Sequence, residues 1–169
     1  VMWGTLLPLL SEGFLGEQIT VGPPFFNRVN IPFGLAILAL MGIGPVIAWR
    51  RASKKNLRKN FLIPLVVGLA TAAVLYPLGI QHGLALTTFA LSAFVMTVIV
   101  TEFWKGTKAR ARIEGEGYFA AFYHLISRNR RRWGGYIVHV AIVLIFTAFA
   151  AEPWYVEIQQ TMEPGESTE

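Results

Sequence analysis

One histidine lies inside an apolar stretch of this sequence, where an ionisable side chain is costly. Residues 134–151 contain no Asp, Glu, Lys or Arg, and His139 is their one histidine. An imidazole at membrane depth is by default a hypothesis about a ligand, a proton path or a cofactor, and neutral imidazole is a good metal ligand. The structural alternative is an imidazole hydrogen-bonded to a Ser, a Thr or a carbonyl of a neighbouring helix. The residues alone leave both interpretations open.

The absence of cysteine and the positions of the other histidines limit the kinds of site that the chain can form. The chain has no cysteine, which excludes disulfides, thiolate metal sites and the Cys-x-x-Cys-His signature of covalent haem attachment. His82 and His124 are predicted to be exposed polar groups, as histidines outside an apolar stretch commonly are. Glu102 follows an apolar block directly and is interpreted as an interfacial group, with a role in a proton path as the functional alternative. Gly134 and Gly135 precede His139 and would let a neighbouring helix or a flat macrocycle approach.

Composition places these residues in a membrane. Of the 169 residues, 54% are hydrophobic and 15% are charged, and the apolar residues form long blocks. Four blocks without Asp, Glu, Lys or Arg are long enough to cross a hydrocarbon core of about 30 Å: residues 31–49, 61–80, 84–101 and 134–151. We therefore predict an all-α integral membrane protein with four transmembrane helices. Residues 1–10 lack a signal-peptide pattern and are interpreted as the end of a preceding, truncated transmembrane helix.

The basic residues predict the topology. Of the 15 Lys and Arg, six lie in the connection 50–60 and eight in the connection 102–133, so the positive-inside rule places both in the cytoplasm. The loop 11–30, the turn 81–83 and the segment 152–169 are then periplasmic. Within the second connection, apolar residues recur at helical spacing over 118–127, which indicates an amphipathic helix on the membrane surface. Weak alternation after Trp154 predicts the start of an outer β segment.

Several ordered motifs resemble the CcmF-type haem lyase subunit of cytochrome c biogenesis. They are GTLLPLL at 4–10, VGPPFFNRVN at 21–30, LMGIGPVIAWR at 40–50, EFWKGTKAR at 102–110 and RRWGGYIVH at 131–139. Together they span nearly the whole chain in the order of the family. The family's tryptophan-rich outer motif, its two outer histidines and a second intramembrane histidine are absent from these residues. The chain thus resembles the later part of the membrane portion, as a fragment of a larger or split protein.

The resemblance implies a cofactor and partners. His139 would be one of two transmembrane histidines that ligate the iron of haem b. That haem would take electrons, with quinol as the implied donor, and would reduce the iron of the haem that is being delivered for attachment to an apocytochrome. A haem chaperone and apocytochrome-binding biogenesis subunits are the implied protein partners, in the inner membrane of a bacterial cell. A fragment of a haem lyase would not be active alone. The cluster formed by Arg128 and residues 130–132 would meet anionic membrane lipid, or alternatively haem propionates at the inner face.

A second function class remains open at this stage. The chain could be a fragment of a multi-pass membrane transporter or scaffold, in which His139 is a structural residue of the helix packing. The presence of a b-type haem in the complete protein would separate the two classes. A nucleic-acid partner is not expected, because the positive-inside pattern accounts for the excess of basic residues.

Overall fold

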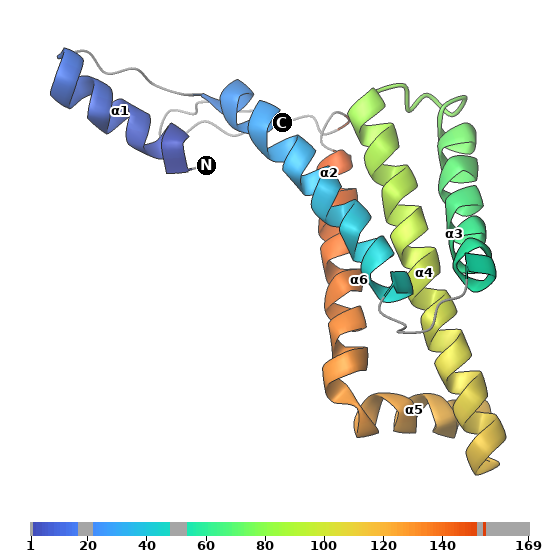
Figure 1. The fold of residues 1–169 in the computed structure, drawn as a ribbon. Coiled ribbons are helices and arrows are strands. Elements are labelled where there is room, and N and C mark those ends of the chain that lie inside the picture. Colours follow the sequence, from blue (N-terminus) through green and yellow to red (C-terminus); the bar gives the residue numbers. More distant parts are fainter. Residues whose placement is uncertain (1, 17–21, 48–53, 152–153, 155–169) are drawn as a thin grey trace, which may run out of the picture.

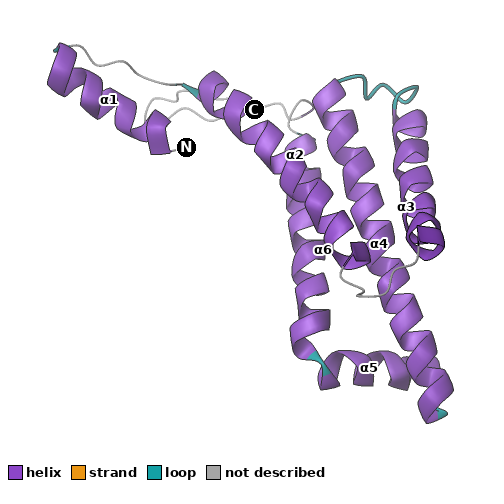
Figure 2. Ribbon diagram, viewed as in Figure 1, coloured by secondary structure: helices purple, strands orange, loops and turns teal. Residues whose placement is uncertain are grey.

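The computed structural model describes residues 2–16, 22–47, 54–151 and 154. In this part of the chain every regular element is a helix, and no strand is present (Figure 2). The helices are α1 (Met2–Leu15), α2 (Pro23–Ile47), α3 (Lys54–Leu75), α4 (Gly83–Glu114), α5 (Tyr118–Arg128) and α6 (Arg130–Ala150). The β segment expected after Trp154 lies outside the described residues. The all-helical class is confirmed.

Helix α4 is the centre of the bundle. It packs against α2, α3, α5 and α6, whereas α2 and α3 contact each other only weakly. Figure 1 shows α3 and α6 flanking α4, with α2 crossing in front of α6 and α1 lying away from the bundle. The core consists of apolar side chains from three helices: Leu38 of α2, Phe94, Val95, Val98 and Ile99 of α4, and Val143 of α6. Within a bilayer these side chains stabilise the bundle through van der Waals packing, because lipid tails are as apolar as the side chains themselves.

Local signals explain why the helices end where they do. Helix α4 continues beyond the apolar block at 84–101 because residues 102–114 contain no proline, and it ends before Gly115, which adopts the left-handed conformation (φ 67°) that commonly ends helices. Helix α6 begins at Arg130, before the apolar run, because Asn129 caps it and accepts a hydrogen bond from the Arg132 backbone N–H. Helix α2 begins at Pro23 rather than at residue 31, since proline is well tolerated in the first turn.

Three helices are long and apolar enough to cross a membrane. These spans are residues 24–45 of α2, α4 (Gly83–Glu114) and α6 (Arg130–Ala150), so the protein is a multi-pass membrane protein. The block 61–80 forms a shorter helix than predicted, because α3 ends at Leu75 and its apolar part is Asn60–Leu75. Pro77, which cannot donate a backbone hydrogen bond, and Gly79 (φ 100°) account for the early end. The structure therefore does not confirm the fourth span.

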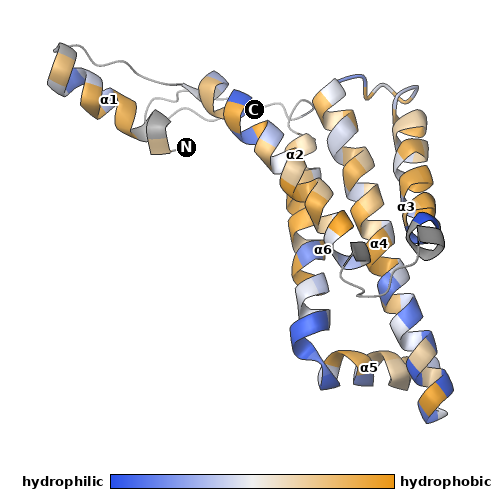
Figure 3. Cartoon of the chain, viewed as in Figure 1, coloured by the Kyte–Doolittle hydropathy of each residue, from blue (hydrophilic) through white to orange (hydrophobic). Residues whose placement is uncertain are grey.

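The polar residues gather at one end of the bundle. Figure 3 shows hydrophilic residues toward the end of α4 and at the start of α6, whereas α5 and the middles of the longer helices are mostly hydrophobic. Helix α5 lies across this end, between the end of α4 and the start of α6 (Figure 1). Its Phe119 is 96% exposed and its Tyr123 is 69% exposed, whereas Ala121 is buried. An apolar face of this kind, next to basic residues, is typical of a helix lying in the membrane interface.

The contact between α3 and α4 depends on a glycine. A Cβ atom added at Gly68 would lie 2.8 Å from the backbone oxygen of Ala90, which cannot move without shifting α4. We expect Gly68→Ala to lower the free energy of unfolding by about 1–3 kcal/mol, the usual cost of overpacking. Thermal unfolding of the purified protein in detergent would measure this loss. Gly44→Ala is the matched control because no atom lies within 4 Å of its added Cβ; an equal loss in both variants would contradict the close-contact explanation.

Candidate functional site

The imidazole of His139 is held by its own helix. Its Nδ1 lies 2.8 Å from the backbone oxygen of Gly135, one turn earlier in α6. A carbonyl oxygen can only accept, so this hydrogen bond requires the proton on Nδ1. In the neutral ring the free lone pair is then on Nε2. A metal-binding histidine adopts this tautomer when a backbone carbonyl accepts the proton of Nδ1 and orients the ring. The helix thus presents a fixed imidazole with one nitrogen available as a ligand.

The surroundings of His139 are compatible with a flat ligand. The side chain is only partly buried, and a Cβ atom added at Gly134 or Gly135 would meet no atom within 4 Å. The ring of Tyr136 approaches that of His139 edge-on, with 6.5 Å between the centroids. One imidazole nitrogen beside an open helix surface fits one axial position of a haem. In the described residues no group of three or more His, Asp or Glu side chains could hold a metal ion.

The other two histidines do not join His139. His82 is exposed at the N-terminal end of α4, at the opposite end of the bundle from α5, and its side chain does not cap the helix. His124 lies on α5, where its Nδ1 is 3.1 Å from both carboxylate oxygens of Glu116. His124 is therefore half-buried rather than fully exposed as predicted, and it has an acidic partner that the sequence did not reveal. Neither residue provides a second imidazole at the position of His139.

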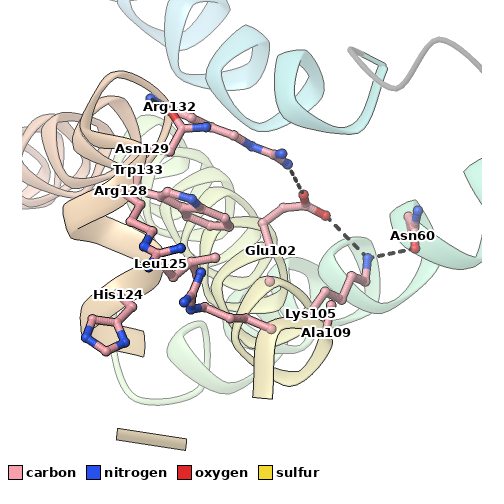
Figure 4. A pocket seen from close by; sticks show the side chains of 12 residues that line it. Asn60, Glu102, Lys105, Ala109, His124, Leu125, Arg128, Asn129, Arg132 and Trp133 are labelled. Atoms are coloured by element: carbon pink, nitrogen blue, oxygen red, sulfur yellow. Dashed lines mark hydrogen bonds and ion pairs between the residues drawn. The ribbon is translucent and has the colours of Figure 1, made fainter. Parts of the chain in front are cut away.

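Glu102 joins three helices at the basic end of the bundle. The residue is only 7% exposed. Its carboxylate lies 3.4 Å from Nζ of Lys105 and 3.6 Å from a guanidinium nitrogen of Arg132 at the start of α6. Lys105 also donates to the side-chain oxygen of Asn60 on α3, at 2.9 Å. Figure 4 shows Lys105 and Arg132 reaching the carboxylate from opposite sides. This network makes Glu102 a structural link between α3, α4 and α6.

A second acid, Glu116, links the end of α4 to α5. Arg110 contacts it through two nitrogens, each 3.2 Å from a carboxylate oxygen, and His124 contacts it from α5. The hydrogen bonds from Arg110, followed by that from His124, lower the pKa of the Glu116 carboxyl below its usual value of 4.5. The carboxylate form is thus favoured in the folded state. The contacts of Glu116 with Arg110 and His124 hold the turn between α4 and α5 in place.

The lowered pKa predicts a pH dependence of stability. A carboxyl whose pKa is depressed on folding stabilises the fold fully above its unfolded value, near pH 4.5, and loses that contribution as the pH falls through the lowered pKa. We expect Glu116→Gln to unfold at a lower temperature than the wild type at pH 7, by a small amount because the site is solvent-exposed. The difference between the two proteins should vanish below the lowered pKa. Thermal unfolding of both proteins across pH 3–7 would test this, with exposed Glu114→Gln as the control.

The side chains at the basic end enclose a cavity of about 660 Å³ between α4, α5 and α6. Lys105, Arg110, Arg128 and Arg132 line it, together with Glu102 and the apolar residues Leu125 and Trp133. Figure 4 shows the Trp133 ring and the labelled basic residues around this space. A second cavity of about 560 Å³ lies at the opposite end, where Asn27, Asn30 and His82 accompany the rings of Phe146 and Phe149. The arginine cluster and His82 are evident in the sequence, whereas these cavities depend on how the helices pack.

Aromatic rings pack the basic end of the bundle. Phe103 of α4 contacts Phe122 of α5, with 5.6 Å between centroids, and Trp133 of α6, with 4.9 Å. A Cβ atom at Gly106 would lie 2.6 Å from the Trp133 ring, so this glycine permits the close approach of α4 and α6. Tyr136 contacts both Phe103 and Trp133 and connects this cluster to His139. The turn of α6 that precedes His139 is therefore packed against α4 by these aromatic rings.

Comparisons with known proteins agree with the motif-based resemblance. The chain is 29% identical to the cytochrome c-type biogenesis protein CcmF of Pseudomonas fluorescens over 85% of its length, and 27% identical to the CcmF of Pseudomonas aeruginosa over all of it. It is 34% identical to the cytochrome c-type biogenesis protein CycK of Rhizobium meliloti over 59% of its length. The resemblance to CcmF-type proteins is therefore confirmed.

The match covers only part of each relative. The chain spans 21% of the Pseudomonas fluorescens protein and 25% of the Pseudomonas aeruginosa protein. No family model matches the chain. No solved structure matches it significantly. The matched region is thus about a fifth to a quarter of the length of these two relatives.

Proposed function

We propose that this relative of the CcmF-type proteins is a membrane segment of a cytochrome c biogenesis protein, in which His139 supplies one axial ligand to haem b. The observation that carries the proposal is the hydrogen bond from Nδ1 of His139 to the Gly135 oxygen, because it leaves Nε2 as the free nitrogen. The names of the relatives support a role in cytochrome c maturation. The second axial ligand would come from residues outside this chain, since one helix offers one imidazole.

The chain's own residues would hold the cofactor. Haem b supplies one-electron chemistry when bound, and its potential depends on its axial ligands and on the dielectric around it. His139 would bind and orient the iron, while Tyr136 and the aromatic rings beneath it would keep α6 at a fixed distance from α4. The open surface at Gly134 and Gly135 would accommodate the macrocycle. As part of a haem lyase, the segment would assist the reduction of haem iron, with quinol as the proposed electron donor.

The proposal includes partners and a location. A haem chaperone and apocytochrome-binding subunits would act with the complete protein, as expected of a biogenesis system that matures cytochromes c. The bacterial relatives and the three apolar spans support placement in the bacterial inner membrane. The basic end of the bundle would face the cytoplasm, in agreement with the positive-inside rule.

Helix α3 would form the fourth crossing. Its apolar part, Asn60–Leu75, is about 24 Å long at 1.5 Å per residue, which falls somewhat short of a hydrocarbon core of about 30 Å. The turn that follows carries Tyr76 and Leu78, both exposed, which would extend the apolar surface toward the outer interface. Since α3 packs along α4, the two helices would cross together. A slightly thinned bilayer accommodates such a mismatch at modest cost.

The spectrum of the intact protein tests the function. A purified protein containing this chain should show the reduced-minus-oxidised bands of a low-spin b-type haem. A colourless protein would reject the haem-handling function and favour the alternative of a transporter or scaffold segment with a structural histidine. His139 would then be an imidazole that caps its own helix turn without binding a ligand.

A further inference from the structure

The cavity at the basic end of the bundle, the inner pocket, has the properties of an anion site. Four cationic side chains line it, Lys105, Arg110, Arg128 and Arg132, against the single carboxylate of Glu102. That carboxylate is already shared between Lys105 and Arg132. Arg110 is paired with Glu116, which does not line the pocket. Among the described residues, no ion pair involves Arg128. The pocket therefore carries an excess of positive charge that its own acids do not balance.

The start of α6 adds to this excess. The first turn of this helix contains Arg130, Arg131 and Arg132 and no acidic residue. Positive side chains at a helix N-terminus are unfavourable, because they lie at the positive end of the helix dipole. Asn129, which caps the helix, also lines the pocket. A bound anion would offset both the dipole and the mutual repulsion of the guanidinium groups, so the arrangement is compatible with a bound anion.

The depth of the pocket indicates where that anion comes from. Helix α5 borders the pocket and exposes the aromatic side chains of Phe119 and Tyr123, which favour the headgroup level of a bilayer. Leu125, Gly106 and Trp133 also line the pocket. A site that combines basic with apolar lining residues matches a phospholipid, whose phosphate is continuous with apolar chains. Basic pockets between transmembrane helices on the cytoplasmic side bind such headgroups.

We propose that the inner pocket binds the phosphate of an anionic phospholipid of the inner leaflet, with Arg128 and Arg132 as the principal contacts. The lipid would join α4, α5 and α6 at the end of the bundle nearest to His139. This site is distinct from the candidate haem site, because His139 is not among its lining residues. Free inorganic phosphate shares the recognised chemistry but lacks the acyl chains that the apolar wall would contact.

Native mass spectrometry of the intact protein, released from detergent, would test the site. Titration with phosphatidylglycerol and with phosphatidylcholine of the same acyl chains should show preferential retention of phosphatidylglycerol. We expect Arg128→Gln to weaken that retention about five-fold, the effect of roughly one cationic contact near the surface. Arg128→Lys should restore much of it. Arg112→Gln removes the same charge from an exposed position of α4 outside the pocket and should leave retention unchanged.

Four outcomes would overturn the proposal. Equal retention of the two lipids would show that the pocket does not select an anionic headgroup. An equal loss in Arg112→Gln and Arg128→Gln would show diffuse attraction by the basic end rather than a site. Displacement of phosphatidylglycerol by millimolar inorganic phosphate would assign the site to soluble phosphate. A loss of haem in Arg128→Gln with unchanged lipid retention would assign the arginine to a haem propionate.

Discussion

Replacing His139 with alanine is expected to remove most of the b-type haem from the intact protein, by more than about ten-fold relative to the wild type. The estimate is conservative, because losing even an outer partner of a metal ligand typically costs 10–100-fold in affinity. The helix itself should tolerate the change, since alanine is the best helix former and the hydrogen bond that the imidazole makes in the described part of the chain is to Gly135 of the same helix. Reduced-minus-oxidised spectra, normalised to protein, would measure the loss.

Two other histidines provide matched controls for this experiment. His82→Ala and His124→Ala remove the same side chain from an exposed and a half-buried position, at opposite ends of the bundle. Both variants should keep their haem, although His124→Ala also loses the contact to Glu116. Maturation of a cytochrome c in cells should fail only for His139→Ala. Full haem content in His139→Ala, with normal insertion, would reduce His139 to a structural residue and leave the axial ligands to be found elsewhere.

The sequence predicted the helical class and the position of His139 in an apolar helix, because long uncharged blocks permit few other structures. It placed the helix ends less well. The block 61–80 contains Pro77 and Gly79, which end α3 at Leu75 although the hydropathy continues. Conversely, α4 runs past its apolar block to Glu114, since the polar residues from Glu102 onward are also compatible with a helix. Hydropathy therefore predicts which residues lie in the membrane, whereas helix-breaking and capping residues determine where each helix ends.

The contacts of a candidate site could be predicted from the sequence only where the residues concerned lie close together in one helix. His139 and Gly135 lie one helical turn apart, so their hydrogen bond follows from local geometry. The inner pocket instead brings together residues from four helices that are separated by up to 73 positions, from Asn60 to Trp133. Glu102 illustrates the difference. Its place after an apolar block indicated an interfacial acid, but its contact with Arg132 depends on how α6 packs against α4.

The antiparallel packing of α3 and α4 makes a sharp prediction about topology. If α3 crosses the membrane, the turn that follows it must lie on the opposite side from both α5 and the start of α3. We therefore expect a cysteine placed at Gln81 to react with a membrane-impermeant maleimide from the periplasmic side of intact cells. Cysteines placed at Arg58 or Arg112 should react only after the membrane is permeabilised. The chain has no cysteine of its own, so each variant adds a single reactive thiol to it.

The two possible paths of α3 give opposite results in this experiment. If α3 only lay along the cytoplasmic surface, Gln81 and Arg58 would be labelled from the same side, and the chain would have three spans. All three positions are exposed, so poor reactivity would not arise from burial in the bundle. Gly22→Cys, exposed just before α2, should react from the periplasmic side in either case and so controls for access.

With α3 crossing, α2, α3, α4 and α6 alternate in direction through the membrane, which places both basic connections and the inner pocket in the cytoplasmic interface. Labelling of Gln81 from the cytoplasm alone would require α4 to enter the membrane from that side and would move α5, with its arginines, to the periplasm, against the charge distribution of the entire chain.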